Sequence, residues 1–337
     1  KGRFRPATFW KTSHCTLATP AVHKDRALLT AFHLNDFPND KQHWFVANCH
    51  LQAGKNGPRR LRQMNEAIRG VLTLAKKLKE PEPEKKIRLI VCGDMNGGQE
   101  CGAIQYLEKG FVDETFLEDN EPVSTSRKDL PLATPMIDAT ACVKRSDGSG
   151  SPPTMVVAEL MSSLMESATY DSPVLSQEML DRLERIYQKL ATGQGGLMTK
   201  QDVERWLIKI NHELGRGDEF RNAALEMGWS DPQPDDPWEI RKKRIELPVD
   251  GVLTLDGFQN VYRKELDGGK FWGIAHDMAV LGDPLPDHGL FAARYDRMYC
   301  SAALQPNAVI DTIVNKACPN ENEPSDHLPV ASSFQLI

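Results

Sequence analysis

The sequence predicts an α+β fold that is interrupted by an all-α insertion. Residues 87–92 form a short apolar run rich in β-branched side chains, which is typical of a buried strand. Residues 43–93 read as strand, helix and strand, and such a crossover lies on one face of a sheet. Between residues 145 and 288 the apolar side chains recur at helical spacing. We therefore expect one α+β domain, made of residues 1–144 and 289–337, and a helical insertion at residues 145–288.

Two strands are expected before the crossover, at residues 7–17 and 27–34, because both stretches are rich in aromatic and β-branched residues. A turn-rich break separates the second of them from the strand at residues 43–51, so these two are expected to pair as a hairpin. In the first stretch, Trp10 and Lys11 are candidates for lining a substrate groove. A core aromatic beside an exposed lysine is the alternative.

The crossover helix is expected to begin near Pro58. Its apolar residues recur at steps of three and four, with arginine and lysine on the other side. These apolar residues are Leu61, Met64, Ile68, Leu72, Ala75 and Leu78. Proline is favoured in the first turn of a helix, because its missing N–H would have no partner there. The basic side is most simply a solvated surface.

The strand at residues 87–92 ends at two polar side chains, Asp94 and Asn96. Residues two apart on an extended segment share a face, so both side chains are expected to point into one cleft. The glycines that surround them free the backbone where the strand leaves the sheet. His50 ends the neighbouring strand and is expected at the same edge. A solvated turn at Asp94 and a strand-capping role for His50 are the alternatives.

A second polar sequence motif lies near the end of the chain. Residues 325–329 read Ser-Asp-His-Leu-Pro and precede a strand-like stretch. Asp326 and His327 thus form an Asp-His pair just before a terminal strand, which repeats the pattern of polar residues at a strand end. A further strand is expected at residues 295–301, and it carries Asp296.

Three phrases, taken in order, resemble the endonuclease/exonuclease/phosphatase superfamily of metal-dependent phosphodiesterases. They are Asn48-Cys49-His50-Leu51, Gly93-Asp94-Met95-Asn96 and Ser325-Asp326-His327-Leu328-Pro329. The amino-acid sequences of these motifs are most similar to those of the deadenylase-like branch. The resemblance implies a layered β-sandwich with flanking helices and Mg²⁺ (or Mn²⁺) as the cofactor. It also implies hydrolysis of phosphodiester bonds at RNA 3′ ends, with RNA favoured over DNA as the substrate.

Phosphodiester hydrolysis needs charge neutralisation on the phosphoryl oxygens, an activated water and in-line geometry. With the resemblance, this implies that Asp94 orients or deprotonates the attacking water and that Asn96 holds the phosphate by its amide. His50 would contact the scissile phosphate or help the leaving group.

The C-terminal strands would supply the rest of the site. The resemblance implies that Asp326 binds the metal and that His327 stabilises developing charge or transfers a proton. Asp296 matches the aspartate of the family's Ile-Asp-Tyr strand, and it would pair with His327, fix its tautomer and raise its pKa. A salt bridge from Asp296 to Arg294 or Arg297 is the alternative.

Relatives in this family place an asparagine, and then a metal-binding glutamate in a Gln-Glu-Val-like phrase, before the strand that opens this chain. No such phrase occurs in the sequence. The resemblance, which begins at residue 7, therefore implies an N-terminally incomplete family domain. The alternative to an enzyme is a catalytically inactive scaffold whose helical insertion binds a protein partner.

Five helices are expected in the insertion, at residues 176–190, 199–214, 218–227, 254–266 and 269–281. Two hinges between them resemble EF-hand loops, as in plant-type calcium-binding members of the family. A calcium loop needs oxygen ligands at its first, third and fifth positions and a bidentate carboxylate at its twelfth. The first hinge has only Asp202 among these positions, and the second has Glu246 and Asp250 but ends at Gly257. Calcium binding is therefore not expected.

Composition narrows the class of protein further. The formal net charge of −6 argues against broad nonspecific binding of nucleic acid. Seven scattered cysteines without Cys-x-x-Cys spacing favour a reducing compartment. We expect a cytoplasmic protein, with the nucleus and the organelles as alternatives. The sequence has no apolar run of membrane-spanning length and no signal-peptide core, so no membrane association is expected.

Overall fold

The computed structural model of the chain describes most of its residues. The described ranges are 6–80, 87–98, 101–123, 130–132, 134–141, 151–166, 173–215, 217–233, 235–238, 244–286, 288–310, 312, 316–321 and 323–337. The chain divides into two compact units, one from residues 1–158 and 290–337 and the other from residues 159–289. Within the described ranges, no helix combines the length and the apolar character that a bilayer crossing requires.

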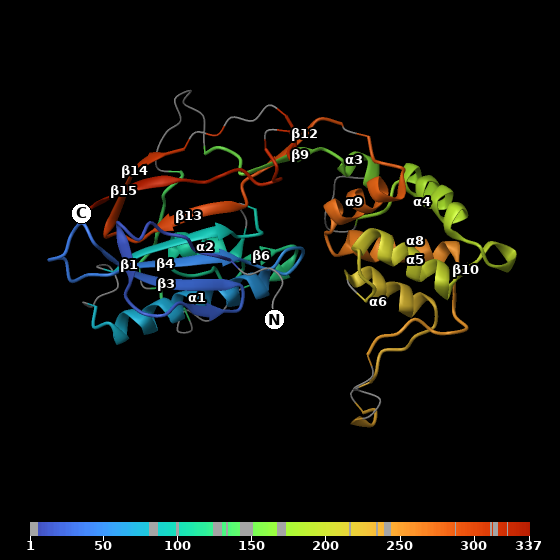
Figure 1. Cartoon of the computed structure of the whole chain (residues 1–337), viewed down its shortest axis with the longest axis horizontal. Helices are drawn as coiled ribbons and strands as arrows, with labels where there is room; N and C mark the ends of the chain where they lie inside the picture. Colours follow the sequence, from blue (N-terminus) through green and yellow to red (C-terminus); the bar gives the residue numbers. More distant parts are fainter. Residues whose placement is uncertain are drawn as a thin grey trace. The chain divides into compact units, whose positions relative to one another are not determined.

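The first unit is built on a seven-stranded sheet (Figure 1). Its strands are β1 (Cys15–Leu17), β2 (Val22–Lys24), β3 (Ala27–Leu34), β4 (Trp44–His50), β5 (Arg88–Asp94), β8 (Ile137–Asp138) and β13 (Asp296–Cys300). The order across the sheet is β1-β3-β4-β5-β13-β8, and β2 also pairs with β3. Strands β4 and β5 are parallel, whereas the other pairs are antiparallel. The predicted α+β class is confirmed.

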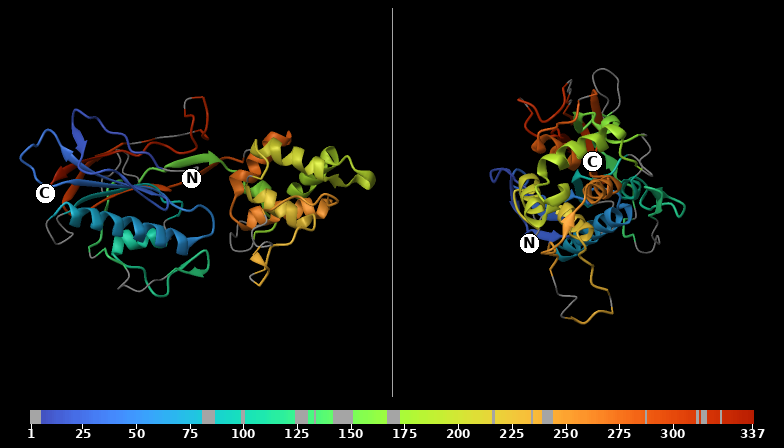
Figure 2. Two further views of the ribbon diagram at one scale, coloured as in Figure 1. Left: turned by 60° about the horizontal axis from the view of Figure 1, so that its bottom comes forward. Right: turned by 90° about the vertical axis from the view of Figure 1, so that its right-hand side faces the viewer.

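Two helices cover one face of this sheet (Figure 2). They are α1 (Gly57–Lys77) and α2 (Gly102–Lys109). Helix α1 connects β4 to β5, as the predicted crossover requires. Its apolar side chains Leu61, Met64 and Ile68 are at most 3% exposed and share one core with Phe45 and Val91 of the sheet. Burying a side chain of this size contributes about 1.5–3 kcal/mol. The helix therefore anchors the two strands that carry the candidate site.

Short ladders complete the first unit. They are β6 (Leu117–Glu118) with β7 (Glu121–Pro122), β9 (Met155–Ala158) with β12 (Leu290–Ala293), and β14 (Leu304–Val309) with β15 (Ser332–Leu336). The chain leaves this unit after β9 and returns to it at β12. Residues 144–153 are rich in Gly, Ser and Pro, which predicts a linker, and they lie mostly outside the described residues, which resume at residue 151.

The strand expected at residues 7–17 is wrong for most of its length, because only β1, at its end, is a strand. Strand β1 pairs antiparallel with the last residues of β3, so an extension toward residue 7 would run past the end of β3 into a turn. Phe9 is 92% exposed, and Trp10 contacts Phe32 edge-on with ring centroids 5.3 Å apart. Aromatic content favours a strand, but a strand also needs a partner alongside.

The second unit is helical. Its helices include α3 (Met161–Leu164), α4 (Gln177–Leu190), α5 (Lys200–Asn211), α6 (Gly217–Glu226), α8 (Leu255–Asp267) and α9 (Phe271–Leu281). Their core contains three aromatic rings in mutual contact, those of Trp206, Phe258 and Tyr262. Helices therefore occur at the segments where the apolar periodicity predicts them.

The two hinges that resemble EF-hand loops lie next to each other. Strand β10 (Met198–Thr199) pairs antiparallel with β11 (Val252–Leu253). In the first hinge, the Asp202 carboxylate accepts hydrogen bonds from the Thr192 hydroxyl at 2.7 Å and from the Thr199 backbone N–H at 2.9 Å. The carboxylate at the last loop position thus has protein donors around it. The EF-hand likeness and the expected lack of calcium binding stay predictions.

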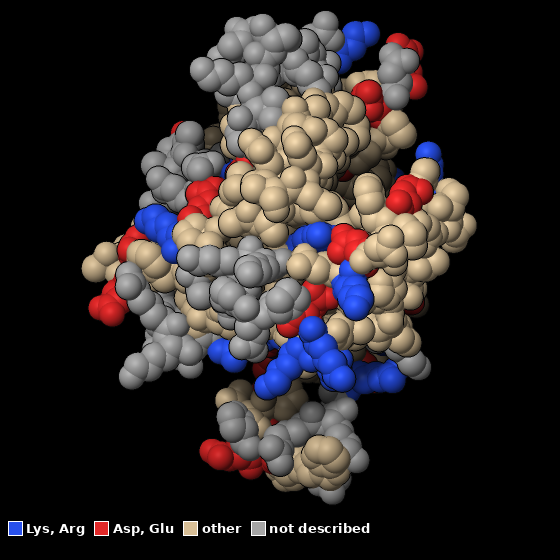
Figure 3. All heavy atoms as spheres, turned by 90° about the vertical axis from the view of Figure 1, so that its left-hand side faces the viewer, with Lys and Arg blue, Asp and Glu red and all other residues tan. Residues whose placement is uncertain are grey.

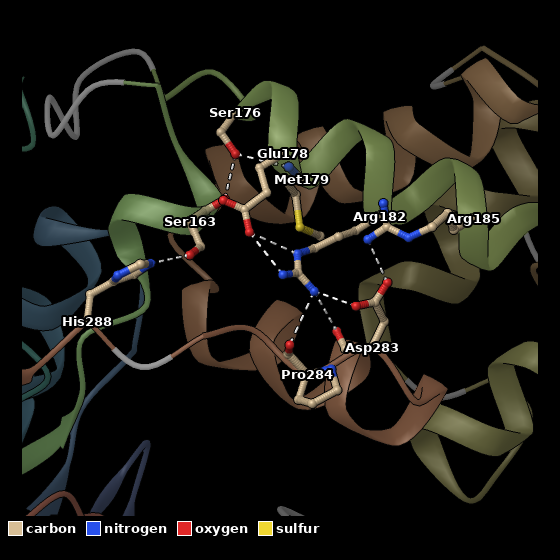
Figure 4. A network of polar contacts seen from close by, with 9 residues as sticks. All are labelled: Ser163, Ser176, Glu178, Met179, Arg182, Arg185, Asp283, Pro284 and His288. Carbon is tan, nitrogen blue, oxygen red and sulfur yellow. Dashed lines mark hydrogen bonds and ion pairs between the residues drawn. The ribbon is translucent and has the colours of Figure 1, made fainter.

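A polar network fastens α4 to the segment that follows α9 (Figure 4). Arg182 donates to Glu178 at 2.9 Å, to the carbonyl oxygen of Pro284 at 3.2 Å and to the Asp283 carboxylate. Arg185 donates to the same carboxylate at 2.9 Å. Because Arg182 and Asp283 are mostly buried, this charged pair is better shielded from salt than a surface pair. The network holds together the early and late parts of the helical unit.

Candidate active site

Three strands bring predicted site residues to one edge of the sheet. In the parallel pair β4–β5, His50 lies opposite Asp94. In the antiparallel pair β13–β5, Asp296 lies opposite the same Asp94. The backbone N–H of Leu51 donates to the carbonyl oxygen of Asp94 at 2.9 Å, so the edge stays hydrogen-bonded just past the end of β4.

Gly93 allows β4 and β5 to come together beside Asp94. Its φ of +120° is rarely adopted by residues with a side chain. A Cβ atom at this position would also lie 2.0 Å from the carbonyl oxygen of Cys49 on β4. Any larger residue would therefore separate the strands where two of the candidate site residues meet.

Asn96 fixes the position of the Asp94 carboxylate. Its backbone N–H donates to Asp94 Oδ1 and its side-chain Nδ2 donates to Asp94 Oδ2, both at 2.8 Å. The same Nδ2 donates to the Leu51 carbonyl oxygen at 3.0 Å. Both amide hydrogens of Asn96 thus have protein acceptors, so the predicted contact with a phosphate requires one of these bonds to be exchanged.

His327 pairs with Asp296 across the edge of the sheet. The two atoms in contact are His327 Nδ1 and Asp296 Oδ2, at 2.6 Å. Thr154 positions both sides of this pair, because its hydroxyl accepts from the Asp296 backbone N–H at 2.9 Å and its carbonyl oxygen accepts from the Leu328 N–H at 2.7 Å. The contact fixes the imidazole with its Nε2 atom available to a ligand.

The arginines considered as partners of Asp296 bind elsewhere. Arg294 donates to both carboxylate oxygens of Asp138 at 2.7 Å, and an Arg297 nitrogen lies 3.6 Å from the same carboxylate. Asp138 is on β8, which pairs with β13. The geometry therefore pairs Asp296 with the histidine and leaves these arginines with Asp138.

The side chains of Asp94, Asp296 and His327 form one compact cluster. Each offers a ligand atom within 4.8 Å of the others, and all three side chains are partly buried. Burial, and then the nearby Asp296 charge, raise the pKa of Asp94. The hydrogen bond that His327 donates to the Asp296 carboxylate is the main cause that raises the pKa of His327 to about 9. At neutral pH the cluster thus holds two acids beside a charged imidazole.

These residues fit a divalent cation. Two carboxylates that face each other repel when both are ionised, and a cation between them removes that cost. Mg²⁺ is usually bound in proteins by one or two carboxylates, with water and substrate phosphate at the other positions. Asp94 and Asp296 would hold such an ion, and the identity of the ion is left open by this donor set.

The remaining predicted residues lie around the cluster. His50 Nε2 is 3.7 Å from Asp94 Oδ2, at the margin of an ion pair. Asp326 is exposed, and its carboxylate is outside the cluster of three, although its charge contributes to the raised pKa of His327. The roles given to His50, Asn96 and Asp326 from the sequence stay predictions.

Two positioning residues were not found from the sequence. Thr154 follows a Ser/Pro-rich stretch that reads as a linker, and nothing in the local pattern marks it. Asp138 stands in an Ile-Asp motif, but its partner Arg294 lies 156 residues later, so the local sequence does not mark the pairing.

Figure 3 shows one face of the molecule with its charged side chains. Lysine and arginine side chains lie there directly beside aspartate and glutamate side chains. The chain as a whole has a formal net charge of −6. Among the described side chains on this face, basic groups are interspersed with acidic ones.

Comparison with known proteins gives matches among solved structures. No family model matches the chain, and no curated protein matches it. A structure of ANGEL2, a 2′,3′-cyclic phosphatase, in complex with adenosine-2′,3′-vanadate is 13% identical over 97% of this chain and 69% of that chain, with a TM-score of 0.41. A second ANGEL2 structure is 12% identical over 96% and 68% of the two chains, with a TM-score of 0.40.

A further match is the catalytic domain of human Nocturnin with a bound sulfate anion. It is 16% identical over 43% of this chain and 45% of that chain, with a TM-score of 0.28. The structural neighbours of this chain are therefore ANGEL2 and Nocturnin, and the sequence motifs resemble the endonuclease/exonuclease/phosphatase superfamily. At TM-scores below 0.5 the likeness does not decide the chemistry, which is inferred from the site residues.

Proposed function

We propose that this protein is a metal-dependent phosphoesterase that hydrolyses phosphodiester bonds at RNA 3′ ends. The observation that carries the proposal is the convergence of Asp94, Asp296 and His327 at one edge of the sheet. Paired carboxylates beside a charged imidazole suit phosphoryl transfer, in which negative charge must be neutralised and protons must be moved.

Each residue of the cluster has a distinct task in this proposal. Asp94 orients the attacking water and accepts its proton, and the two hydrogen bonds from Asn96 hold its carboxylate in position. Asp296 holds the His327 ring through Nδ1, and the protonated ring donates a hydrogen bond or a proton from Nε2. A divalent metal ion, when bound, would neutralise charge on the phosphoryl oxygens.

An RNA 3′ end is the substrate that the motifs favour, since their wording is most similar to the deadenylase-like branch. One matched structure, that of a 2′,3′-cyclic phosphatase, holds adenosine-2′,3′-vanadate. A terminal 2′,3′-cyclic phosphate and an internal 3′–5′ linkage both present a phosphodiester, and they differ in whether a nucleotide leaves. The two activities are therefore distinguishable on matched oligonucleotides.

The test uses the full chain with 5′-labelled oligoadenylates that end either in a 3′-hydroxyl or in a 2′,3′-cyclic phosphate. With Mg²⁺ or Mn²⁺ we expect shortening of the first, opening of the second, or both, and no reaction in EDTA. His327→Ala should lower kcat at least about 100-fold, because its charge acts in the transition state. His23→Ala, at an exposed histidine of β2, is the matched control and should keep wild-type activity.

Wild-type turnover by His327→Ala, or equal turnover with and without EDTA, would refute the proposed mechanism. Mn²⁺ binding by calorimetry without hydrolysis of either oligonucleotide would instead favour the inactive scaffold, in which the helical insertion binds a protein partner.

A further inference from the structure

A histidine pair lies at the other end of the strands that carry the candidate active site. Strands β3 and β4 are antiparallel and place Phe32 opposite Trp44, so the next pair outward is His33 opposite His43. The two rings are in contact, with centroids 4.2 Å apart. Their Nε2 atoms face each other at 3.1 Å. The two nitrogens can share a hydrogen bond when one carries a proton and the other a lone pair.

A buried glutamate determines the tautomer of one of these rings. Glu80 Oε1 contacts His43 Nδ1 and also accepts from the His43 backbone N–H at 3.0 Å. The side chains of His43 and Glu80 are 8% and 3% exposed. Because a carboxylate accepts hydrogen bonds, Nδ1 of His43 carries the ring proton or shares it with Glu80. In the neutral ring, Nε2 then presents a lone pair toward His33.

Glu80 lies just after the C-terminal end of helix α1. The helix ends at Lys77, and Lys79 adopts a left-handed φ of +58° that turns the chain. The Glu80 N–H then donates to the Ala75 carbonyl oxygen at 3.0 Å, which closes the turn. The carboxylate is therefore held by backbone as well as by its contact with His43.

We propose that His33 and His43 form a second metal site, which binds a late first-row divalent ion of the Zn²⁺ type through both Nε2 atoms. Zinc–imidazole bonds of about 2.0–2.1 Å place two nitrogens about 3.3 Å apart at a tetrahedral angle. The observed nitrogen separation is 3.1 Å, and the exposed His33 ring would turn so that its Nε2 lone pair meets that of His43 at the ion. Glu80 is the outer carboxylate that orients the metal-binding ring of His43 through Nδ1.

Zn²⁺ binding replaces the hydrogen bond between the two rings. His33 then carries its single proton on Nδ1, so no net proton is lost and both Nε2 lone pairs point at the ion. Solvent on the His33 side completes the coordination with water. Imidazole nitrogens favour Zn²⁺ over Mg²⁺, so excess Mg²⁺ is not expected to compete for the histidine pair.

The site is distinct from the candidate active site. His43 precedes the first residue of β4 and His50 is its last, and a strand of this length spans about 20 Å. A metal ion at the histidine pair would therefore tie β3, β4 and the end of α1 together without contact to Asp94.

The experiment is Zn²⁺ titration of the full chain by calorimetry in excess Mg²⁺, with all variants carrying His327→Ala to remove the one histidine of the other cluster. We expect His33→Ala to lower Zn²⁺ affinity at least about tenfold or to abolish one binding event. Glu80→Gln should weaken the same event about 10-fold, since it keeps both histidines but changes the orienting partner. His23→Ala is the matched control and should bind like the parent.

A second measurement separates a metal site from a hydrogen bond that merely fastens the strands. Zn²⁺ should raise the Tm of the parent and of His23→Ala, and the rise should be lost in His33→Ala. A lower Tm for His33→Ala with an unchanged Zn²⁺ response would show that the pair is structural only. Equal Zn²⁺ affinity in His33→Ala and the parent would likewise overturn the proposal.

Discussion

The sheet unit and the helical unit bury acidic side chains in opposite ways. In the helical unit, burial opposes ionisation of Asp202, but hydrogen bonds from Thr192 and Thr199 outweigh it and lower the pKa. In the sheet unit, Asp94 is placed beside a second carboxylate, and its pKa is raised by burial and by that charge. Hydrogen bonds within the fold therefore account for the buried Asp202, whereas the facing carboxylates of Asp94 and Asp296 are an arrangement that a cation would stabilise.

The helical unit also contains acids that resemble neither case. Burial raises the pKa of Asp277 to about 7, and it is also the main cause that raises the pKa of Glu265 to about 7. Asp277 accepts from the Tyr262 hydroxyl at 3.4 Å, and Glu265 pairs with Lys270 at 2.8 Å. A raised pKa alone therefore does not mark a catalytic acid, because the surroundings decide what the group does.

The largest expected contrast is between two Asp→Asn substitutions. Asp94→Asn should lower kcat at least about 100-fold in the oligoadenylate assay, because it removes the proposed base and a metal ligand. Asp277→Asn should leave kcat within twofold. Turnover and circular dichroism of both variants check this, and a comparable loss in both would erase the distinction between the units.

The pH dependence of stability sharpens the same contrast. The pKa of Asp277 is near 7 in the folded chain and near 3.8 in the unfolded chain, so between pH 4 and 7 the folded state holds a proton that the unfolded state has released. The free energy of unfolding therefore decreases as pH rises through this window. Above pH 7 the effect of Asp277 no longer changes with pH. Glu265 acts in the same direction.

Asp277→Asn should accordingly reduce the decrease in the free energy of unfolding between pH 4 and 7. At pH 8 it should stabilise the helical unit by a few kcal/mol at most. Urea unfolding at pH 5 and pH 8, followed by tryptophan fluorescence, is the measurement. A steeper slope in the variant than in the parent would show that the sign is wrong.

A smaller effect is expected when the helical unit is removed. Ala158 and Leu290 are register partners at the end of the β9–β12 ladder, so a two-residue Asn-Gly turn can join them in place of residues 159–289. The sheet should remain folded, with a cooperative thermal transition and a Tm within a few degrees of the parent's first transition. Loss of the strand signal in circular dichroism would show that the insertion belongs to the core of the sheet unit.

The smallest effect is expected from calcium. The last position of the second hinge is Gly257, which has no carboxylate, and Asp202 in the first hinge already accepts hydrogen bonds from two threonines. Calcium at about 10⁻⁷ to 10⁻⁵ M, the range of sensor proteins, should give no binding heat and no change in helix signals. Micromolar binding accompanied by a helix rearrangement would contradict this.

The parts of the fold that were predictable from the sequence are those with a strong local period. The apolar run at residues 87–92 and the stripe on α1 each specify one element and its buried face. The failure at residues 7–17 has the opposite cause, since a strand is completed by a partner that the local sequence does not contain. Residues far apart in the chain decide that partner.

The candidate active site was also only partly predictable, because some partners lie far apart in the sequence. The motifs single out Asp94 and His327, but the partner of Asp296 was left open between the histidine and two arginines, because all of them are near in sequence or motif. Asp138, on strand β8, pairs with both arginines, and Asp296 therefore pairs with the histidine. No pattern within the strand at residues 295–301 could have predicted that.

The β9–β12 ladder has a consequence for the order in which the chain folds. Its two strands are separated by residues 159–289, and closing a flexible loop of that length costs entropy that grows by about 0.6 kcal/mol per doubling of length. When the helical unit has folded, its ends are already together, because the Ser163 hydroxyl on α3 contacts the His288 ring at 2.7 Å. The length of the loop that the ladder must close is then halved about five times over. The entropic cost of forming the ladder falls by about 3 kcal/mol as a result. The strand that carries Asp296 directly follows this ladder, so assembly of the candidate active site is expected to wait for the helices.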